Sequence, residues 1–164
     1  SPSRGLGDVY KRQAVERIYK LKRSENKKSM LMLCASDDMV VRYVNKAPGI
    51  AFEVMELATS PLTAILPGAA GVAENLIPEE RTLGVRIPDH EFCRRILRGL
   101  GRPVVSTSAN ISGEATPAGL AEVSREIIDG VDFVVNPRFE GKPTKKASSI
   151  IAFGEGGEVK IIRE

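Results

Sequence analysis

The sequence is poor in the residues that most often carry metal or nucleophilic chemistry: among 164 residues it has one histidine, two cysteines and no tryptophan. Cys34 and Cys93 are far apart in the sequence and lack metal-ligand spacing, so we expect two buried thiols rather than a disulfide. His90 lies at the first turn of a predicted helix, and no serine or cysteine nucleophile pattern surrounds it. We therefore expect His90 to lie at the surface and not to be catalytic.

Long apolar runs are also absent. No stretch approaches the roughly 20 apolar residues that cross a bilayer, and no secretory signal is visible, so we expect a cytoplasmic protein with no membrane partner. The net charge of +3 is too small to establish a nucleic-acid partner. A balance of 42% hydrophobic and 27% charged residues over this length is typical of one globular domain.

The most informative stretch is residues 103–113. Val104 and Val105 are typical of the end of a buried strand, after which the segment turns polar and ends at Gly113. Small hydrogen-bonding side chains at the carboxyl edge of a strand are what an open α/β sheet uses to hold a polar ligand. Hydroxyls and an amide can bind phosphate or ribose oxygens without adding charge. A polar loop that caps itself is the alternative. The polar side chains are Ser106, Thr107, Ser108 and Asn110.

Cations gather in residues 20–28 and appear once inside an apolar strand. The first group is either a solvated charge run or a cationic loop for phosphates, and it does not follow the Walker pattern. Arg86 lies in the predicted strand 82–88, where an arginine is costly unless it meets an anion or a carboxylate. An edge-strand arginine that reaches solvent is the alternative. The first group contains Lys20, Lys22, Arg23, Lys27 and Lys28.

Strand and helix patterns interleave along most of the chain, which predicts an α/β fold whose mixed sheet is flanked by helices and is antiparallel at the final hairpin. Residues 1–13 lack periodicity, and we expect them to form a disordered leader outside a domain spanning 14–164. Predicted helices begin near Ala14, Asp37, Ile50, Asp89 and Thr116, and predicted strands cover 30–34, 62–66, 82–88, 131–135, 148–153 and 159–163, with a further strand ending at 104–105.

Five of these segments also resemble the YrdC/YciO family, which comprises the threonylcarbamoyl-AMP synthases of tRNA modification and their paralogues. They match in order and spacing, and the resemblance covers residues 14–164. The Ser-Thr-Ser-Ala-Asn element within the third segment is the most specific part of the match. The segments are residues 14–22, 83–88, 105–113, 148–151 and 161–163.

The resemblance implies a twisted sheet with a concave basic cavity and a reaction that joins L-threonine, bicarbonate and ATP into threonylcarbamoyl-AMP with release of pyrophosphate. A separate threonylcarbamoyl transferase complex would then modify tRNA. Carried over by position, Lys22 and Arg23 are the candidate catalytic residues, and Arg86, Ser106 and Ser148 would bind threonine. The ATP-binding set is Thr82, Ser108, Asn110, Thr116 and Arg163, with Lys28 of the cationic stretch added.

The chemistry fits this resemblance. A carbamate that attacks the α-phosphorus brings one anion against another, so catalysis consists mostly of positioning and charge neutralisation by lysine, arginine and Mg²⁺. We expect Mg²⁺ with the ATP and assign no metal ligands. A Ser-His-Asp or Cys-His constellation is not required.

Two departures from the family pattern affect the expected activity. The family's Lys-x-Arg places an arginine two residues after Lys22, where this chain has Ser24, and Arg23 is one residue early. The family also opens with a Pro-Thr-Asp-Thr-Val-Tyr-Gly-Leu segment that forms one wall of the threonine site, and only Gly-Leu-Gly at 5–7 precedes unrelated residues here. We expect that wall to be missing or replaced in this chain, and we expect the chain to bind nucleotide weakly and to turn over slowly.

Two other functions stay open on the sequence alone. One is a YciO-like paralogue that binds tRNA or double-stranded RNA through the cations of residues 20–28 and 138–146. The other is a truncated structural or regulatory module with little activity. An RNA affinity that falls steeply with salt would favour the first, whereas threonine-dependent pyrophosphate release would favour the enzyme.

Overall fold

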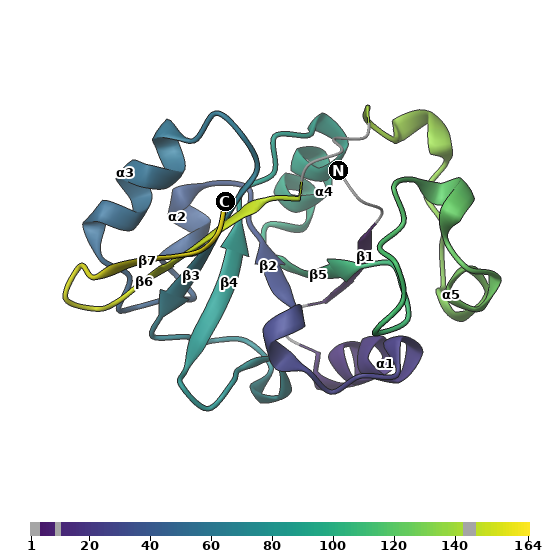
Figure 1. The fold of residues 1–164 in the computed structure, drawn as a ribbon, viewed down its shortest axis with the longest axis horizontal. Coiled ribbons are helices and arrows are strands. Elements are labelled where there is room, and N and C mark those ends of the chain that lie inside the picture. Colours follow the sequence, from purple (N-terminus) through teal and green to yellow (C-terminus); the bar gives the residue numbers. More distant parts are fainter. Residues whose placement is uncertain (1–3, 9–10, 143–146) are drawn as a thin grey trace.

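The computed structural model describes residues 4–8, 11–142 and 147–164. Within these residues seven strands form one mixed sheet (Figure 1). In spatial order they are β1 (Arg4–Asp8), β5 (Val104–Ser108), β2 (Leu31–Leu33), β4 (Thr82–Arg86), β3 (Leu62–Pro67), β6 (Ser149–Phe153) and β7 (Val159–Arg163). The α-helices are α1 (Arg12–Lys22), α2 (Asp37–Val40), α3 (Gly49–Leu57), α4 (Glu91–Leu100) and α5 (Arg125–Gly130). Short 3-10 helices are η1 (Lys27–Ser29), η2 (Glu74–Leu76), η3 (Leu120–Glu122) and η4 (Pro137–Phe139).

The sheet mixes both strand directions, which confirms the predicted α/β class. β2 runs parallel to β4, and β3 runs parallel to β6. The pairs β1–β5, β5–β2, β4–β3 and β6–β7 are antiparallel. The final pair is the predicted hairpin, closed by a hydrogen bond from Gly154 N to Glu158 O at 2.8 Å. Because side chains alternate along a strand and paired residues share a face, this register assigns each strand residue to one face of the sheet.

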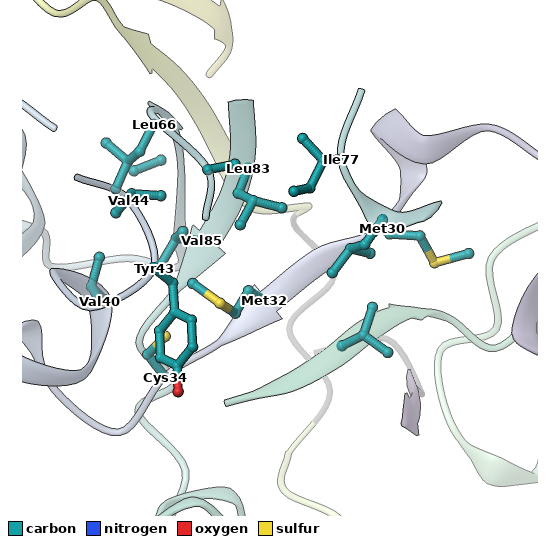
Figure 2. Packing of buried hydrophobic residues seen from close by; sticks show 14 of the residues in the cluster. Met30, Met32, Cys34, Val40, Tyr43, Val44, Leu66, Ile77, Leu83 and Val85 are labelled. Carbon is teal, nitrogen blue, oxygen red and sulfur yellow. The ribbon is translucent and has the colours of Figure 1, made fainter. Parts of the chain in front are cut away.

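One face of the sheet carries the main hydrophobic core. Met32 on β2, Val85 on β4 and Val105 on β5 belong to it and are fully buried. The periodicity of α1 brings Val15 and Tyr19 onto the same core, as helical spacing of four residues predicts. Helices α2 and α3 add further side chains, and Figure 2 shows part of this packing, including Val40, Tyr43, Val44, Leu66 and Leu83.

The second face of the sheet has a smaller apolar cluster. Leu33 of β2 and Val104 of β5 pack there against Leu97 of α4, and all three are buried. The remaining strand positions on this face include four of the polar residues predicted to bind ligand, namely Thr82, Arg86, Ser106 and Ser108. The two faces therefore differ in kind, because one is closed by α1, α2 and α3 and the other combines a small apolar cluster with a polar region.

The N-terminal segment differs from the predicted disordered leader. The backbone of Arg4–Asp8 forms β1 and pairs antiparallel with β5, from Arg4 opposite Ser108 to Asp8 opposite Val104. Helix α1 begins at Arg12, two residues before the expected domain start at Ala14. The expectation is therefore wrong for these described residues. A strand at the sheet edge is held by backbone hydrogen bonds to β5, and such pairing leaves no periodic hydrophobic signal.

The predicted strand over residues 131–135 does not form. Phe133 there is 79% exposed, and the neighbouring Asp132 accepts two hydrogen bonds from the Arg17 guanidinium of α1 at 2.9 and 3.0 Å. This exposed ion pair links the segment to α1. The high β-propensity of the segment is thus overridden by its tertiary surroundings.

Two helix starts also differ from prediction. The residues after Thr116 form η3 and then the separate helix α5, because the side chains of Glu140 and Glu122 accept hydrogen bonds from the backbone N–H groups of Leu120 and Ala118. At α4 the N-cap is His90 rather than Asp89, since the His90 Nδ1 accepts from Cys93 N at 3.4 Å. Asp89 pairs with Arg94.

Both cysteines are free thiols, with Cys34 buried and Cys93 half-buried. The expectation of thiols rather than a disulfide is confirmed, although only Cys34 is fully buried. Among the described helices, none is both long and apolar enough to cross a membrane.

Stability at alkaline pH should depend on two buried groups of the core. Burial raises the pKa of the Cys34 thiol from 9.0 to about 12 and the pKa of the Tyr19 hydroxyl from 10.0 to about 12. The unfolded chain ionises both groups first, so their stabilisation is complete below about pH 9 and is lost as the pH rises toward 12. We expect the free energy of unfolding in urea to fall across this range, and to fall less in a Cys34→Ala/Tyr19→Phe double variant. An equally steep fall in that variant would contradict the assignment.

Candidate functional site

The candidate site lies on the second face of the sheet, around the ends of β4 and β5. Alternation along β4 puts Thr82, Gly84 and Arg86 on one face, because Leu83 and Val85 between them belong to the main core. Leu31 of β2 is opposite Gly84 on one side and Ser106 on the other. Leu31 contacts the second-face cluster and not the main core. Four polar residues of β4 and β5 therefore share a sheet face: Thr82, Arg86, Ser106 and Ser108. Thr107 lies on the opposite face, and its hydroxyl donates to Ser29 O at 3.1 Å.

Lys22 joins the end of α1 to the polar segment that follows β5. Its side chain is only 4% exposed. The ammonium group donates to Ser108 O at 2.6 Å, to Asn110 O at 2.9 Å and to Ser108 Oγ at 3.4 Å. The Lys22 carbonyl in turn accepts from Ser112 N at 2.8 Å. Residues that are 86 and 88 positions from Lys22 in sequence are thus held around one cation.

The same segment contains buried polar atoms that the protein itself leaves without a partner. Within the described residues, Ser106 Oγ and Asn110 Oδ1 have no hydrogen-bond partner, and Ser106 is fully buried. The Asn110 amide nitrogen does donate, to the carbonyls of Ile111 and Glu114. An unsatisfied buried polar group costs about 1–3 kcal/mol, and such groups call for a functional or structural explanation. Ser106 lies in the middle of β5 and Asn110 lies just after its end, within the segment for which the sequence predicts a ligand.

Arg86 is the centre of a second hydrogen-bonded group. Its guanidinium NH2 donates to Thr63 Oγ1 of β3 at 3.0 Å and to Ser148 Oγ at 2.5 Å. Arg163 of β7 donates from its Nε and NH2 groups to Ser148 O at 3.0 and 2.7 Å. Arg86, Thr63 and Ser148 are all more than 90% buried. The structure therefore brings together three residues predicted from sequence, Arg86, Ser148 and Arg163, and adds Thr63.

Other predicted residues lie outside these two groups. Arg23 has a left-handed backbone, with φ of 54° at the end of α1, and its guanidinium pairs with Glu126 of α5 at 2.5 Å. Lys28 pairs with Glu80 at 3.1 Å. Thr116 is exposed, and Thr82 is half-buried at the start of β4. Of the basic loop 138–146 considered for RNA, residues 143–146 lie outside the described residues.

Thr63 is the residue that the sequence interpretation missed. It lies in the apolar segment Leu62–Pro67, where only its hydroxyl is polar. Thr63 and Arg86 share one sequence feature, because each is a polar side chain inside an otherwise apolar strand. Only the pairing of β3 with β4 shows that the two signals belong to one cluster.

Carboxylates lie beside the polar face. A hollow lined by Ser36, Asp37, Met55, Glu56 and Ile87 lies beyond the end of β4. Burial, followed by the nearby charges of Glu56 and Asp38, raises the pKa of Asp37. Within the part of the chain that the structure describes, no three His, Cys, Asp or Glu side chains are grouped to hold a metal ion.

The fold and the site define the class as an α/β protein with a mixed sheet that gathers cations, hydroxyls and an amide at one face. The model of the Sua5/YciO/YrdC family, described as telomere recombination, matches residues 6–164. The chain therefore belongs to the Sua5/YciO/YrdC family, which confirms the resemblance seen in the sequence.

Known relatives agree with this membership. A threonylcarbamoyl-AMP synthase of Idiomarina loihiensis is 33% identical over 147 residues, which cover 86% of this chain and 79% of the relative. The crystal structure of E. coli YciO matches 100% of this chain and 79% of its own, with a TM-score of 0.83 at 22% identity. P. abyssi Sua5 complexed with L-threonine matches 89% of this chain with a TM-score of 0.78 at 23% identity. This chain spans only 43% of that Sua5 chain, and the two structural matches show the fold alone.

Proposed function

We propose that the chain is an L-threonylcarbamoyladenylate synthase, a nucleotidyltransferase that converts L-threonine, bicarbonate and ATP into threonylcarbamoyl-AMP and pyrophosphate. The observation that carries the proposal is the shared sheet face on which Arg86, Ser106 and Ser108 lie. The name of the Idiomarina loihiensis relative supports the same activity. The product would serve tRNA threonylcarbamoyladenosine modification through a separate transferase complex, in the cytoplasm.

The chemistry of the face suits this reaction. The carbamate of threonine attacks the α-phosphorus of ATP, and pyrophosphate leaves. Both reactants are anions, so the protein has to position them and neutralise charge rather than supply a nucleophile. The cations and neutral donors at this face meet that need, and the predicted concave basic cavity is the shape that would enclose them.

We assign roles by position on that face. Arg86 binds the threonine carboxylate, and Ser148 and Ser106 complete the threonine side. The unpartnered Ser106 Oγ and Asn110 Oδ1 are suited to ligand hydrogen bonds, because binding would satisfy buried atoms that the protein leaves unpaired. Ser108 and Asn110 bind nucleotide. The remaining ATP-binding residues in the proposal are Lys28, Thr82, Thr116 and Arg163.

Lys22 and Arg23 have different positions in the proposed reaction. Lys22 brings a buried positive charge to the nucleotide end of the site and holds the Ser108–Asn110 turn. Arg23 would have to exchange its exposed partner Glu126 for a phosphate. Such an exchange costs little, because exposed ion pairs contribute about 0–1 kcal/mol.

Mg²⁺ belongs to the proposal as a companion of ATP. Magnesium in nucleotide sites is usually held through substrate phosphates and water with one or two carboxylates. When bound it would neutralise phosphate charge. The described residues of this face are donors rather than carboxylates, so they would hold the phosphates and not the ion itself.

RNA binding is the second candidate, and we use it as an alternative outcome of the test. Two cations of the RNA track considered from sequence, Arg23 and Lys28, are paired with Glu126 and Glu80. A truncated module with little activity is the third. Neither has a specific observation in its favour.

Pyrophosphate release tests the proposed function directly. We expect release that requires threonine, bicarbonate and ATP together, and we expect Ser108→Ala to lower the rate about 10- to 100-fold, as loss of a charge-stabilising donor does. Ser112→Ala is the matched control, because Ser112 is an exposed serine of the same turn. Its hydrogen bond to the Lys22 carbonyl comes from the backbone N–H, which the substitution keeps. Release without threonine dependence, or no release together with salt-sensitive RNA binding, would contradict the proposal.

A further inference from the structure

Thr63, Arg86 and Ser148 form a closed triangle of hydrogen-bonding groups from three separate segments. Arg86 NH2 lies 3.0 Å from Thr63 Oγ1 and 2.5 Å from Ser148 Oγ. The two hydroxyl oxygens are 3.4 Å apart. Their side chains come from β4, β3 and the residue just before β6, and all three residues are buried.

The direction of the hydrogen bonds follows from the chemistry of the groups. A guanidinium only donates, so both hydroxyl oxygens accept from Arg86. One hydroxyl then donates to the other across the 3.4 Å separation. If Thr63 donates, the Ser148 oxygen accepts from two directions, and its own hydrogen points away from the triangle as a donor. Thr63 would therefore control the direction in which Ser148 donates.

Backbone contacts fix the frame around this triangle. Arg163 donates twice to Ser148 O, and Ser149 N donates to Pro61 O at 3.0 Å. The strand pairings β4–β3 and β3–β6 hold the three segments in register. With the frame fixed, the one adjustable part of the cluster is the orientation of its side chains, which Thr63 connects.

We propose that Thr63 is a positioning residue for the substrate threonine. The Thr63 hydroxyl fixes the Arg86 guanidinium and turns the Ser148 hydroxyl, so that both groups present donors to the substrate carboxylate. This inference rests on the proposed synthase function. Thr63 itself need not touch the substrate. Its hydroxyl, rather than its shape, is the functional part.

Two substitutions separate the hydroxyl from the shape. Thr63→Val keeps the branched shape and loses the hydroxyl, whereas Thr63→Ser keeps the hydroxyl and loses a methyl group. We expect Thr63→Val to raise the KM for threonine about tenfold, the size expected for one lost hydrogen bond, with kcat and the KM for ATP within about twofold. Thr63→Ser should restore the wild-type KM to within about threefold. If Thr63 only fills space, the order is reversed and Thr63→Ser is the more impaired variant, which would overturn the proposal.

Controls keep the result tied to the triangle. Thr59→Val makes the same change at an exposed threonine of the loop before β3 and should leave the KM unchanged. Ser148→Ala should raise the KM for threonine, and the Thr63→Val/Ser148→Ala double variant should be less impaired than the product of the two single effects, because Thr63 acts partly through the Ser148 hydroxyl. Independent, multiplying effects would overturn the proposal. If Thr63→Val does not fold, Thr63→Ser remains the test, and a KM for threonine raised by more than about threefold in that variant would overturn the proposal.

Calorimetric titration with L-threonine separates a failure of this inference from a failure of the proposed function. If the wild type binds threonine but releases no pyrophosphate, the synthase proposal fails, and weaker threonine binding by Thr63→Val still supports the positioning role. If the wild type releases pyrophosphate and Thr63→Val has the same threonine affinity, only the positioning role fails. A wild type that neither binds threonine nor turns over overturns both.

Discussion

Replacing Arg86 with lysine should lower kcat/KM for threonine about 100-fold, mostly through a higher KM, while the chain stays folded. The lysine keeps the positive charge but loses the planar fork that suits a carboxylate and that donates here to two hydroxyls at once. Truncating one partner of a buried, hydrogen-bonded charge pair costs about 2–5 kcal/mol in binding, which covers a loss of this size. Threonine-dependent pyrophosphate release, measured over a range of threonine concentrations, gives both constants.

The stability of the Arg86→Lys variant distinguishes binding from folding. We expect a change in the free energy of unfolding below about 2 kcal/mol, because lysine can donate to either hydroxyl in the same buried space. Arg42→Lys is the matched control, since Arg42 is exposed. A variant with normal threonine kinetics would show that Arg86 serves the fold alone.

Replacing Lys22 with methionine should affect stability and activity together. The Lys22 ammonium donates to the carbonyl oxygens of Ser108 and Asn110, and hydrogen bonds to charged groups contribute about 1.5–3 kcal/mol each. Methionine has similar length and no donor, so both carbonyls would lose this partner. We expect a loss of about 2–4 kcal/mol in the free energy of unfolding and a fall of at least about 100-fold in pyrophosphate release.

Lys20→Met is the control for this prediction. Lys20 lies two residues earlier on α1 and is exposed, so its replacement should change the free energy of unfolding by less than about 0.5 kcal/mol. Urea denaturation of both variants makes the comparison. Equal effects of the two substitutions would contradict the role given to the Lys22 contacts.

Patterns that depend on neighbouring residues in sequence were predicted well. The helix that buries Val15 and Tyr19, the strands before Cys34 and at Arg86, and the final hairpin all follow from local periodicity and turn residues. The Ser106–Asn110 segment was predicted to follow a strand that ends at Val105, whereas β5 continues to Ser108, so only the end of that segment lies beyond the strand. The family resemblance, carried by these segments, is confirmed.

Features that depend on distant residues were not predicted. Residues 131–135 have the composition of a strand, yet Asp132 is held by Arg17, more than 100 positions away. The backbone of Arg4–Asp8 forms a strand although its sequence shows no alternation. In each case the contact joins segments that are far apart in the sequence, and local sequence patterns carry no information about such contacts.

The sequence by itself determined the α/β class, most of the central strands and helices and the hydroxyl-rich segment around β5, because propensity and periodicity act over a few residues. Only the tertiary structure decided which side chains meet. Cross-strand register puts Arg86 with Thr63 and Ser148, and the docking of α1 brings Lys22 to Ser108 and Asn110. Burial then determines the physical result, since a cation removed from water has to be hydrogen-bonded by whatever groups the fold brings beside it.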